Sequence, residues 1–272
     1  MSRPMTDPAA DPVTNPAAGP VTGPLADSIT MIGRSVRLAR RNTDTLVMSV
    51  VLPLLMMTLF VHVFGGAIDT GTRYVNYVVP GIVLLCVGYG AASTAMSVAD
   101  DLTKGMVDRL RSMPIRPFVV LTGHVVASVA RNAVSTTVVI GAAVAMGFRP
   151  TASPVEWAAT AGLLLLYVLA LSWLAAGLGA VAKSVEAAGT FSFLMLFLPY
   201  LSSAFVPTGT MPAVLRVISE HQPITPIIET VRGLLTGTPV GGAGWAALAW
   251  SVGLLAVSFT LATLLYRRRT RD

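Results

Sequence analysis

Apolar residues are concentrated in six long runs along the chain, and short polar segments separate these runs. An α-helix rises 1.5 Å per residue, so about 20 apolar residues span the roughly 30 Å hydrocarbon layer of a bilayer. The last run begins and ends with an aromatic residue, as is typical at the headgroup level. The pattern therefore predicts an all-α integral membrane protein with six transmembrane helices, at residues 46–64, 74–99, 118–147, 157–182, 187–206 and 245–266.

A charged segment, Asp100–Pro117, interrupts the apolar pattern between the second and third runs. Read as a helix, it collects Leu102, Met106, Leu110 and Met113 on one face. Its charged residues fall three or four positions apart, and each such pair stabilises a helix by roughly 0.2–0.5 kcal/mol. The spaced pairs are Asp100–Lys104, Lys104–Asp108 and Asp108–Arg111. Two interpretations stay open: a helix that docks on a soluble partner, or a solvated loop that orients the membrane spans.

The stretch before the first run, residues 27–44, has an amphipathic pattern. Its apolar positions share one side of a helix, and Arg34, Arg37 and Arg41 share another. Basic residues that face anionic headgroups above an apolar face are typical of a helix lying in the membrane interface. The alternative is an ordinary basic flank of the first span.

The segment 207–244, before the last run, is too long for a simple turn. Val214, Leu215 and Ile218 share a face in its first half, which predicts a short helix over 211–220. A second short helix is predicted over 224–235, with Ile227, Ile228, Val231 and Leu235 on one face and with Glu229 and Arg232 paired at i, i+3. Two amphipathic helices bounded by proline and glycine favour a re-entrant hairpin or an outer lid, which must be buried against protein if it enters the bilayer.

Composition and charge agree with a membrane protein and set its orientation. The chain is 54% hydrophobic and only 12% charged, too little charge to cover the surface of a soluble domain of 272 residues. With the N-terminus inside, fourteen basic residues fall in cytoplasmic segments and four in outer ones, so the net charge of +6 reflects topology and not nucleic-acid binding. The cytoplasmic set is Arg3, Arg34, Arg37, Arg40, Arg41, Lys104, Arg109, Arg111, Arg116, Lys183, Arg267, Arg268, Arg269 and Arg271; the outer set is Arg73, Arg149, Arg216 and Arg232. We therefore expect both termini to be cytoplasmic.

Residues 1–26 differ from the rest, because a proline recurs every four residues among small and polar side chains. Such a sequence builds neither a core nor a helix, and it predicts a disordered, polyproline-like cytoplasmic tail. The remaining residues, 27–272, then form a single transmembrane domain.

Residues for catalysis or metal binding are not grouped along the chain. The three histidines and Cys86 lie in different segments, and no nucleophile motif of the G-x-S-x-G type is present. The stretch 177–184, GLGAVAKS, lacks the second glycine of a phosphate-binding loop and ends an apolar run instead of following a strand. We therefore expect no catalytic residue, no metal and no nucleotide bound by this chain.

Arg131 and Asn132 are the notable polar residues within a predicted span. An arginine at the bilayer centre costs roughly 2.5–3.5 kcal/mol on insertion scales, so it should face protein or a water-filled path. Alternatively, the span starts near Asn132 and Arg131 reaches the cytoplasmic interface. No chain of acidic residues crosses the spans, which weakens the case for an ion-coupled carrier.

The order of these features resembles the ABC-2 type permeases, the membrane subunits of bacterial ABC exporters, and within them the daunorubicin-resistance type. The resemblance covers Ile29 to Arg269. It departs mildly at Gln222, where the family more often has asparagine, and at Asp100–Asp101, where it often has glutamate. The matching residues are Lys104-Gly105, Asp108-Arg109-Leu110, Met113-Pro114 and Arg116 after the second run, and Met211-Pro212, Leu215, Gln222-Pro223, Arg232 and Gly237 before the sixth.

The resemblance implies an exporter of amphipathic molecules (a drug, an antibiotic or a lipid) in the cytoplasmic membrane. Two permease subunits, identical or similar, would form the pathway, and separate ATPase subunits would bind ATP and Mg²⁺. The ATPase would contact a coupling helix that includes Lys104, Gly105, Met106, Asp108, Arg109, Leu110, Arg111 and Pro114. The external hairpin, with Met211, Pro212, Gln222, Pro223, Glu229 and Arg232, would help to close the outer exit. An ion-coupled carrier is the alternative function, followed by an intramembrane enzyme.

Overall fold

The computed structural model describes residues 43–104 and 117–269, and every regular element in these two ranges is helical. The predicted proline-rich tail, the interfacial helix with Arg34, Arg37 and Arg41, and most of the charged segment lie outside the described residues. The long elements are α2 (Thr43–Leu59), α3 (Tyr74–Thr103), α5 (Pro117–Ala145), α6 (Pro154–Val181), α7 (Val185–Phe197) and α10 (Ala243–Arg269). The short ones are η1 (Phe60–Phe64), η2 (Leu198–Leu201), η3 (Thr208–Thr210), α8 (Ala213–His221) and α9 (Ile224–Thr236).

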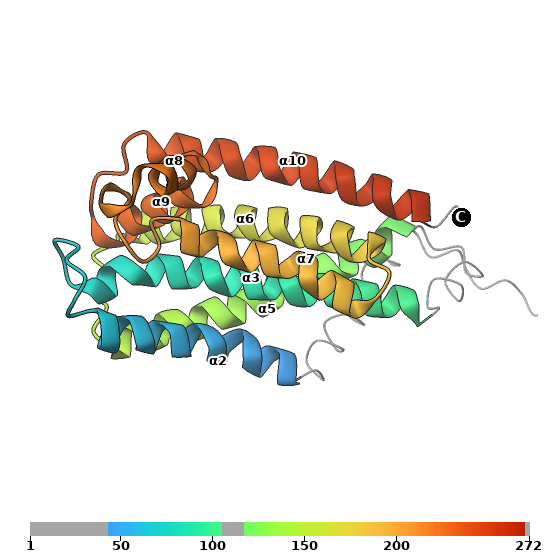
Figure 1. The fold of residues 1–272 in the computed structure, drawn as a ribbon, viewed down its shortest axis with the longest axis horizontal. Coiled ribbons are helices and arrows are strands. Elements are labelled where there is room, and N and C mark those ends of the chain that lie inside the picture. The colour runs from blue at the N-terminus through green and yellow to red at the C-terminus, as the bar shows by residue number, and fades with distance from the viewer. Residues whose placement is uncertain (1–42, 105–116, 270–272) are drawn as a thin grey trace, which may run out of the picture.

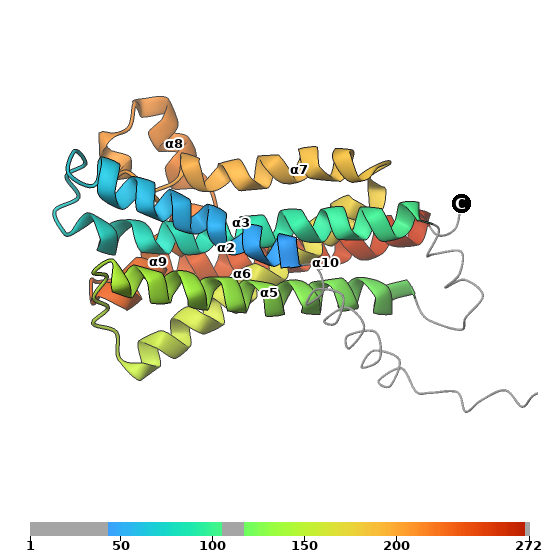
Figure 2. The ribbon, with the colours of Figure 1, turned by 90° about the horizontal axis from the view of Figure 1, so that it is seen from below.

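The long helices run side by side along the long axis of the molecule, and α3 lies in the middle in both views (Figures 1 and 2). We call the end at which α3 ends and α5 begins, Thr103 and Pro117, the linker end. We call the opposite end, where α8 and α9 lie, the hairpin end. The last turn of α10 is also at the linker end, and α2 starts on the side of the bundle nearer to that end (Figure 1).

Five helices have the length and composition of a membrane span, so the chain is a multi-pass membrane protein. They agree with five of the six predicted runs: Val47–Phe64, Tyr74–Thr103, Val120–Ala145, Pro154–Val181 and Ala243–Tyr266. The run predicted at 187–206 is a shorter apolar helix, α7 continued by the 3₁₀ turn η2. Pro199 lies in η2, where the α-helix tightens, because proline cannot donate to the preceding turn.

Burial separates α3 from the outer helices. In the most apolar 18-residue window of each helix, 78% of the α3 residues are buried, against 17% for α2 and for α10. All three are apolar around their whole circumference, a property shared by helices that face protein and helices that face lipid. Close contacts hold α3 against α6: a Cβ added at Gly179 would lie 2.3 Å from the Ala95 carbonyl oxygen.

Local signals set two helix ends more exactly than the apolar pattern does. α6 begins three residues before the predicted start, because Ser153 caps it and Glu156 completes a capping box, with Ser153 N donating to Glu156 Oε2 at 2.6 Å. α3 continues to Thr103, so Asp100 and Asp101 belong to the last turn of the second span and not to a separate helix.

Candidate transport site and the two ends of the bundle

Arg131 lies in the middle of α5 and contacts α3. Its Nη2 donates to the Gly90 carbonyl oxygen at 3.2 Å and to Thr94 Oγ1 at 2.9 Å. α5 is continuous from Pro117 to Ala145, and the guanidinium contacts protein on α3. The point along α5 at which the membrane span starts stays a prediction.

Asn132 extends this polar contact from α5 to α6. Its Nδ2 donates to the Ser128 carbonyl oxygen at 2.9 Å, and Ser172 of α6 donates to Ser128 Oγ at 2.9 Å. The Asn132 amide packs directly against Gly90, where an added Cβ would lie 2.2 Å from Nδ2. A polar cluster therefore joins three long apolar helices: Gly90 and Thr94 of α3, Ser128, Arg131 and Asn132 of α5, and Ser172 of α6.

This cluster contains several hydrogen-bond donors, but the positive charge of Arg131 is not balanced by a nearby carboxylate among the described residues. In the part of the chain that the structure describes, no carboxylate forms an ion pair with Arg131, and two buried atoms, Arg131 Nε and Asn132 Oδ1, have no hydrogen-bond partner. Unpartnered polar groups are costly in a bilayer and mark functional positions more often than structural ones. The arrangement can hold a polar or anionic group, but it offers no base, nucleophile or metal site. No group of three or more metal-ligating side chains occurs within 43–104 and 117–269.

At the linker end, the described residues form one ion pair and one carboxylate–histidine hydrogen bond. Lys104 Nζ lies 2.7 Å from Asp100 Oδ2, as the i, i+4 spacing predicts, and this contact raises the pKa of Lys104. Asp101 pairs across to α5, with its Oδ2 3.1 Å from His124 Nε2. These contacts fix the last turn of α3, which leads into the predicted coupling segment. The other coupling residues predicted from the sequence, Gly105, Met106, Asp108, Arg109, Leu110, Arg111 and Pro114, lie outside the described residues.

At the hairpin end, α8 and α9 occupy the two stretches predicted as short helices. Met211 and Pro212 precede α8, and the break between the helices falls at Gln222–Pro223. Gln222 Nε2 donates to the Leu201 carbonyl oxygen at 2.7 Å, so the break is tied to the end of α7 and η2. Whether the pair enters the bilayer stays a prediction.

Arg232 of α9 makes the most extensive contacts of this region. Its guanidinium carbon lies 3.7 Å above the centre of the Tyr77 ring, and it donates to the carbonyl oxygens of Tyr77 at 3.2 Å and Ser203 at 2.6 Å. Burial lowers the pKa of Arg232, although Tyr77 and Glu229 oppose the shift. The predicted Glu229–Arg232 ion pair is wrong: these two described side chains do not approach within 4.0 Å, because Arg232 turns to buried acceptors while Glu229 stays exposed.

Apart from Arg131, the lysines and arginines of the described ranges lie toward one end of the bundle or the other, as the sequence predicts. Lys104 and Lys183 follow α3 and α6 at the linker end. Arg73, Arg149, Arg216 and Arg232 lie in α8, α9 or the connections at the hairpin end.

Sequence reasoning found Arg131 and Asn132 but missed their partners. Gly90, Thr94 and Ser172 are small residues on other helices, and nothing in their spacing distinguishes them from ordinary packing residues. Ser128 carried a usable signal, since it lies one helical turn before Asn132. The pairing of His124 with Asp101 gave no local signal, because the residues are 23 positions apart.

Comparison with known proteins gives the family. Residues 28–236 match the family model described as ABC-2 type transporter. The chain is 29% identical over 246 residues to the daunorubicin resistance ABC transporter permease protein DrrB1 of Streptomyces coeruleorubidus, covering 89% of this chain and 86% of that protein. It is 25% identical over 233 residues to a probable doxorubicin resistance ABC transporter permease protein, DrrC, of Mycobacterium tuberculosis, covering 84% and 83%. The chain therefore belongs to the ABC-2 type transporter family.

Proposed function

We propose that this chain is the permease subunit of an ATP-driven exporter, which moves an amphipathic small molecule out across the cytoplasmic membrane. The family match carries the proposal, since it spans the linker segment, the polar cluster and the hairpin together. The lack of a nucleotide-binding motif in the sequence agrees with a separate ATPase subunit that binds ATP and Mg²⁺.

The ATPase is proposed to dock at the linker end, on the segment from Lys104 to Pro114. The Asp101–His124 contact supports this assignment, because it joins the last turn of α3 to α5, and the Lys104–Asp100 ion pair stabilises that same turn. A force applied to the segment would then act directly on two spans. The stretch 27–44 is proposed to lie in the inner membrane interface.

The remaining topology is part of the same proposal. α7 with η2 supplies the sixth crossing, both termini are cytoplasmic, and a second copy or a similar permease completes the pathway. The separation of basic residues between the two ends supports the orientation. The names of the relatives, which refer to daunorubicin and doxorubicin resistance, support a drug-like or antibiotic substrate, with a lipid as the other amphipathic class.

Co-purification tests the proposal. The tagged chain, extracted in mild detergent from its native host, should bring a stoichiometric soluble ATPase with it, identified by mass spectrometry. Asp108→Ala and Arg109→Ala should lower the amount of bound ATPase about tenfold, as expected when one or two charged contacts worth about 1.4 kcal/mol in total are lost. Glu220→Ala is the matched control, because Glu220 is an exposed charge at the opposite end. A chain that repeatedly purifies alone would refute the proposal.

An ion-coupled carrier is distinguished by its energy source. In inverted membrane vesicles, uptake should require ATP and survive collapse of the proton gradient. Uptake that persists without ATP and follows the gradient would identify the carrier instead.

A further inference from the structure

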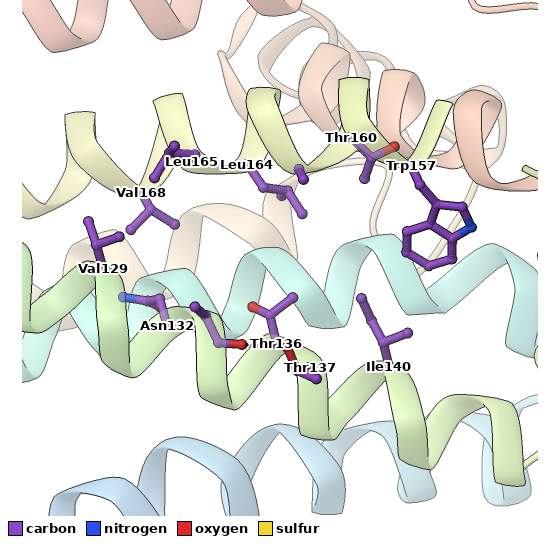
Figure 3. Close-up of a pocket in the computed structure, with 12 residues that line it drawn as sticks. Val129, Asn132, Thr136, Thr137, Ile140, Trp157, Thr160, Leu164, Leu165 and Val168 are labelled. Carbon is purple, nitrogen blue, oxygen red and sulfur yellow. Dashed lines mark hydrogen bonds between the residues drawn. The ribbon is translucent and has the colours of Figure 1, made fainter. Parts of the chain in front are cut away.

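A groove of about 290 Å³ lies between α5 and α6. It is lined from Val129 to Ile140 on α5 and from Trp157 to Val168 on α6, eleven residues apart on each helix, so it is about 16 Å long at 1.5 Å per residue. Figure 3 shows Val129 and Val168 toward one end, and Ile140 and Trp157 toward the other. The volume spread over this length gives a cross-section of about 18 Å². The groove is therefore as wide as one hydrocarbon chain and narrower than a fused-ring molecule.

One side of the groove is open to the outside of the bundle. Ala133, Thr137 and Ala161 line it and are exposed. The outside of the spans of a multi-pass membrane protein contacts lipid. The groove is therefore continuous with the surface that the bilayer covers, and a lipid chain can enter it without leaving the hydrocarbon layer.

The wall of the groove is mostly apolar. Of the residues that line it within the described ranges, none is charged. Asn132 and Thr160 are only 2% exposed, and the Asn132 amide packs against Gly90 of α3 rather than being presented to the groove. The hydroxyl of Thr137 donates to the Ala133 carbonyl oxygen one turn earlier. The part of an occupant that lies in the groove therefore has to be apolar.

The groove covers one half of α5 along its length. This helix has 29 residues, from Pro117 to Ala145, so Val129 lies near its middle and Ile140 lies five residues before its end at the hairpin end. The hydrocarbon layer of a bilayer is about 30 Å thick, so one leaflet is about 15 Å deep. The groove thus has the length of an acyl chain in one leaflet. Trp157 lies at its outer limit, toward the hairpin end, and an indole is typical of the headgroup level.

We propose that the α5–α6 groove holds one acyl chain of a bilayer phospholipid from the leaflet at the hairpin end. The carboxyl end of the chain lies beside Ile140 and Trp157, and the methyl end lies beside Val129 and Val168. Lipid tails are as apolar as the groove wall, so van der Waals contact holds the chain and the shape of the chain decides whether it fits. In the orientation proposed above, this leaflet is the outer one. Such a lipid is a resident part of the folded protein and not transported cargo.

Photolabelling at two depths tests the position of the chain. The purified full chain is placed in nanodiscs of palmitoyl-oleoyl-phosphatidylcholine with a small fraction of a phosphatidylcholine probe. The straight acyl chain of the probe carries a diazirine either near its carboxyl group or near its methyl end. The first probe should label peptides within 136–140 and 157–161, and the second should label peptides within 129–133 and 164–168. The reverse order, which a chain from the other leaflet would give, would overturn the proposal.

A branched lipid tests whether the groove selects a chain by its width. In nanodiscs of diphytanoylphosphatidylcholine, whose methyl branches widen the chains, the straight probe should be enriched in the groove. Labelling of the groove peptides relative to the lipid-exposed stretch 252–261 of α10 should rise about fivefold over its value in straight-chain nanodiscs, because a branched chain overpacks the groove. An unchanged ratio would show that the groove is ordinary lipid-facing surface, which contradicts the proposal.

Matched substitutions on α6 separate the groove from the surface around it. Ala161→Phe fills the groove and should abolish the enrichment, whereas Ala159→Phe, at an exposed alanine that does not line the groove, should preserve it. Ala133→Phe fills the groove from α5 and is an independent second variant. Each variant is first shown to be folded by the failure of the buried Cys86 to react with a maleimide dye. Enrichment that survives in the folded Ala161→Phe and Ala133→Phe chains would refute a chain in the groove.

Other occupants give different results. Efficient disulfide crosslinking between Ala133→Cys chains in the membrane would show that a second copy covers the groove, and displacement of the probe by the exported compound would assign the groove to the substrate. Either result would overturn the proposal. The labelling needs neither the ATPase nor a transported compound, so its failure would leave the permease proposal standing.

Discussion

The two short helices of the hairpin end, α8 and α9, have similar amphipathic patterns and opposite burial. In α9, Ile227 and Ile228 are completely buried, and the helix packs against α3, α6 and α10. In α8, Val214 and Ile218 are 73% and 47% exposed. An apolar face therefore shows which side of a helix avoids water, but not whether protein or something else covers that side.

The polar contacts of the two helices differ in the same way. Arg232 of α9 reaches Tyr77 and Ser203, 155 and 29 residues away in the sequence. Arg216 of α8 donates only to nearby carbonyl oxygens, such as that of Thr208 at 3.2 Å. α9 is thus part of the bundle, whereas α8 is folded mainly on its own connection.

Removing buried side-chain atoms from α9 should give the largest loss of stability. We expect Ile228→Ala to destabilise the folded chain by about 2–5 kcal/mol, because it leaves a cavity in a fully buried site. Ile218→Ala in α8 is the matched control and should change stability by less than about 0.5 kcal/mol in detergent. Cys86, the one cysteine of the chain and completely buried, provides the measurement: a maleimide dye reacts with it only on unfolding. Equal shifts of the unfolding midpoint in both variants would contradict the comparison.

Replacing Arg232 of α9 and Arg216 of α8 by lysine should give a smaller difference in stability between the two helices. Arg232→Lys keeps the charge but loses the stacking on Tyr77 and the fork of donors, so we expect a loss of about 1–3 kcal/mol. Arg216→Lys loses exposed hydrogen bonds and should stay within about 0.5 kcal/mol. The reaction of Cys86 with the maleimide dye measures the stability of both variants. A larger loss for Arg216→Lys would mean that α8 also supports the bundle.

The sequence predicts the helices well where the apolar pattern is long and uninterrupted. The third run was predicted at 118–147, and α5 spans Pro117–Ala145. The buried face of α9 agrees with the predicted set of Ile227, Ile228, Val231 and Leu235. The run at 187–206 was less predictable, because hydropathy alone does not show that Pro199 tightens the end of α7.

Side-chain partners were less predictable than helices. The i, i+3 spacing of Glu229 and Arg232 predicted an ion pair. In the folded chain, the Arg232 guanidinium instead contacts the Tyr77 ring and the Ser203 carbonyl oxygen, which are distant in the sequence. For Arg131, sequence reasoning left two alternatives open, since its acceptors on α3 are about 40 residues away. Polarity within an apolar run identified Arg131 and Asn132, two of the six residues of the cluster, but only the tertiary structure shows which helices the cluster joins.

The smallest expected effect concerns what covers the apolar face of α8. We expect this face to rest on the bilayer surface, because an amphipathic helix with exposed valine and isoleucine lowers its free energy by burying them among acyl chains. Spin labels at Val214→Cys and Ile218→Cys should be more accessible to oxygen, and labels at Arg216→Cys and Glu220→Cys more accessible to a water-soluble nickel complex. The buried Cys86 should remain unlabelled in the folded chain. Equal access of the nickel complex to all four sites would place α8 in water, while loss of access for both reagents at 214 and 218 would show that a protein partner covers this face.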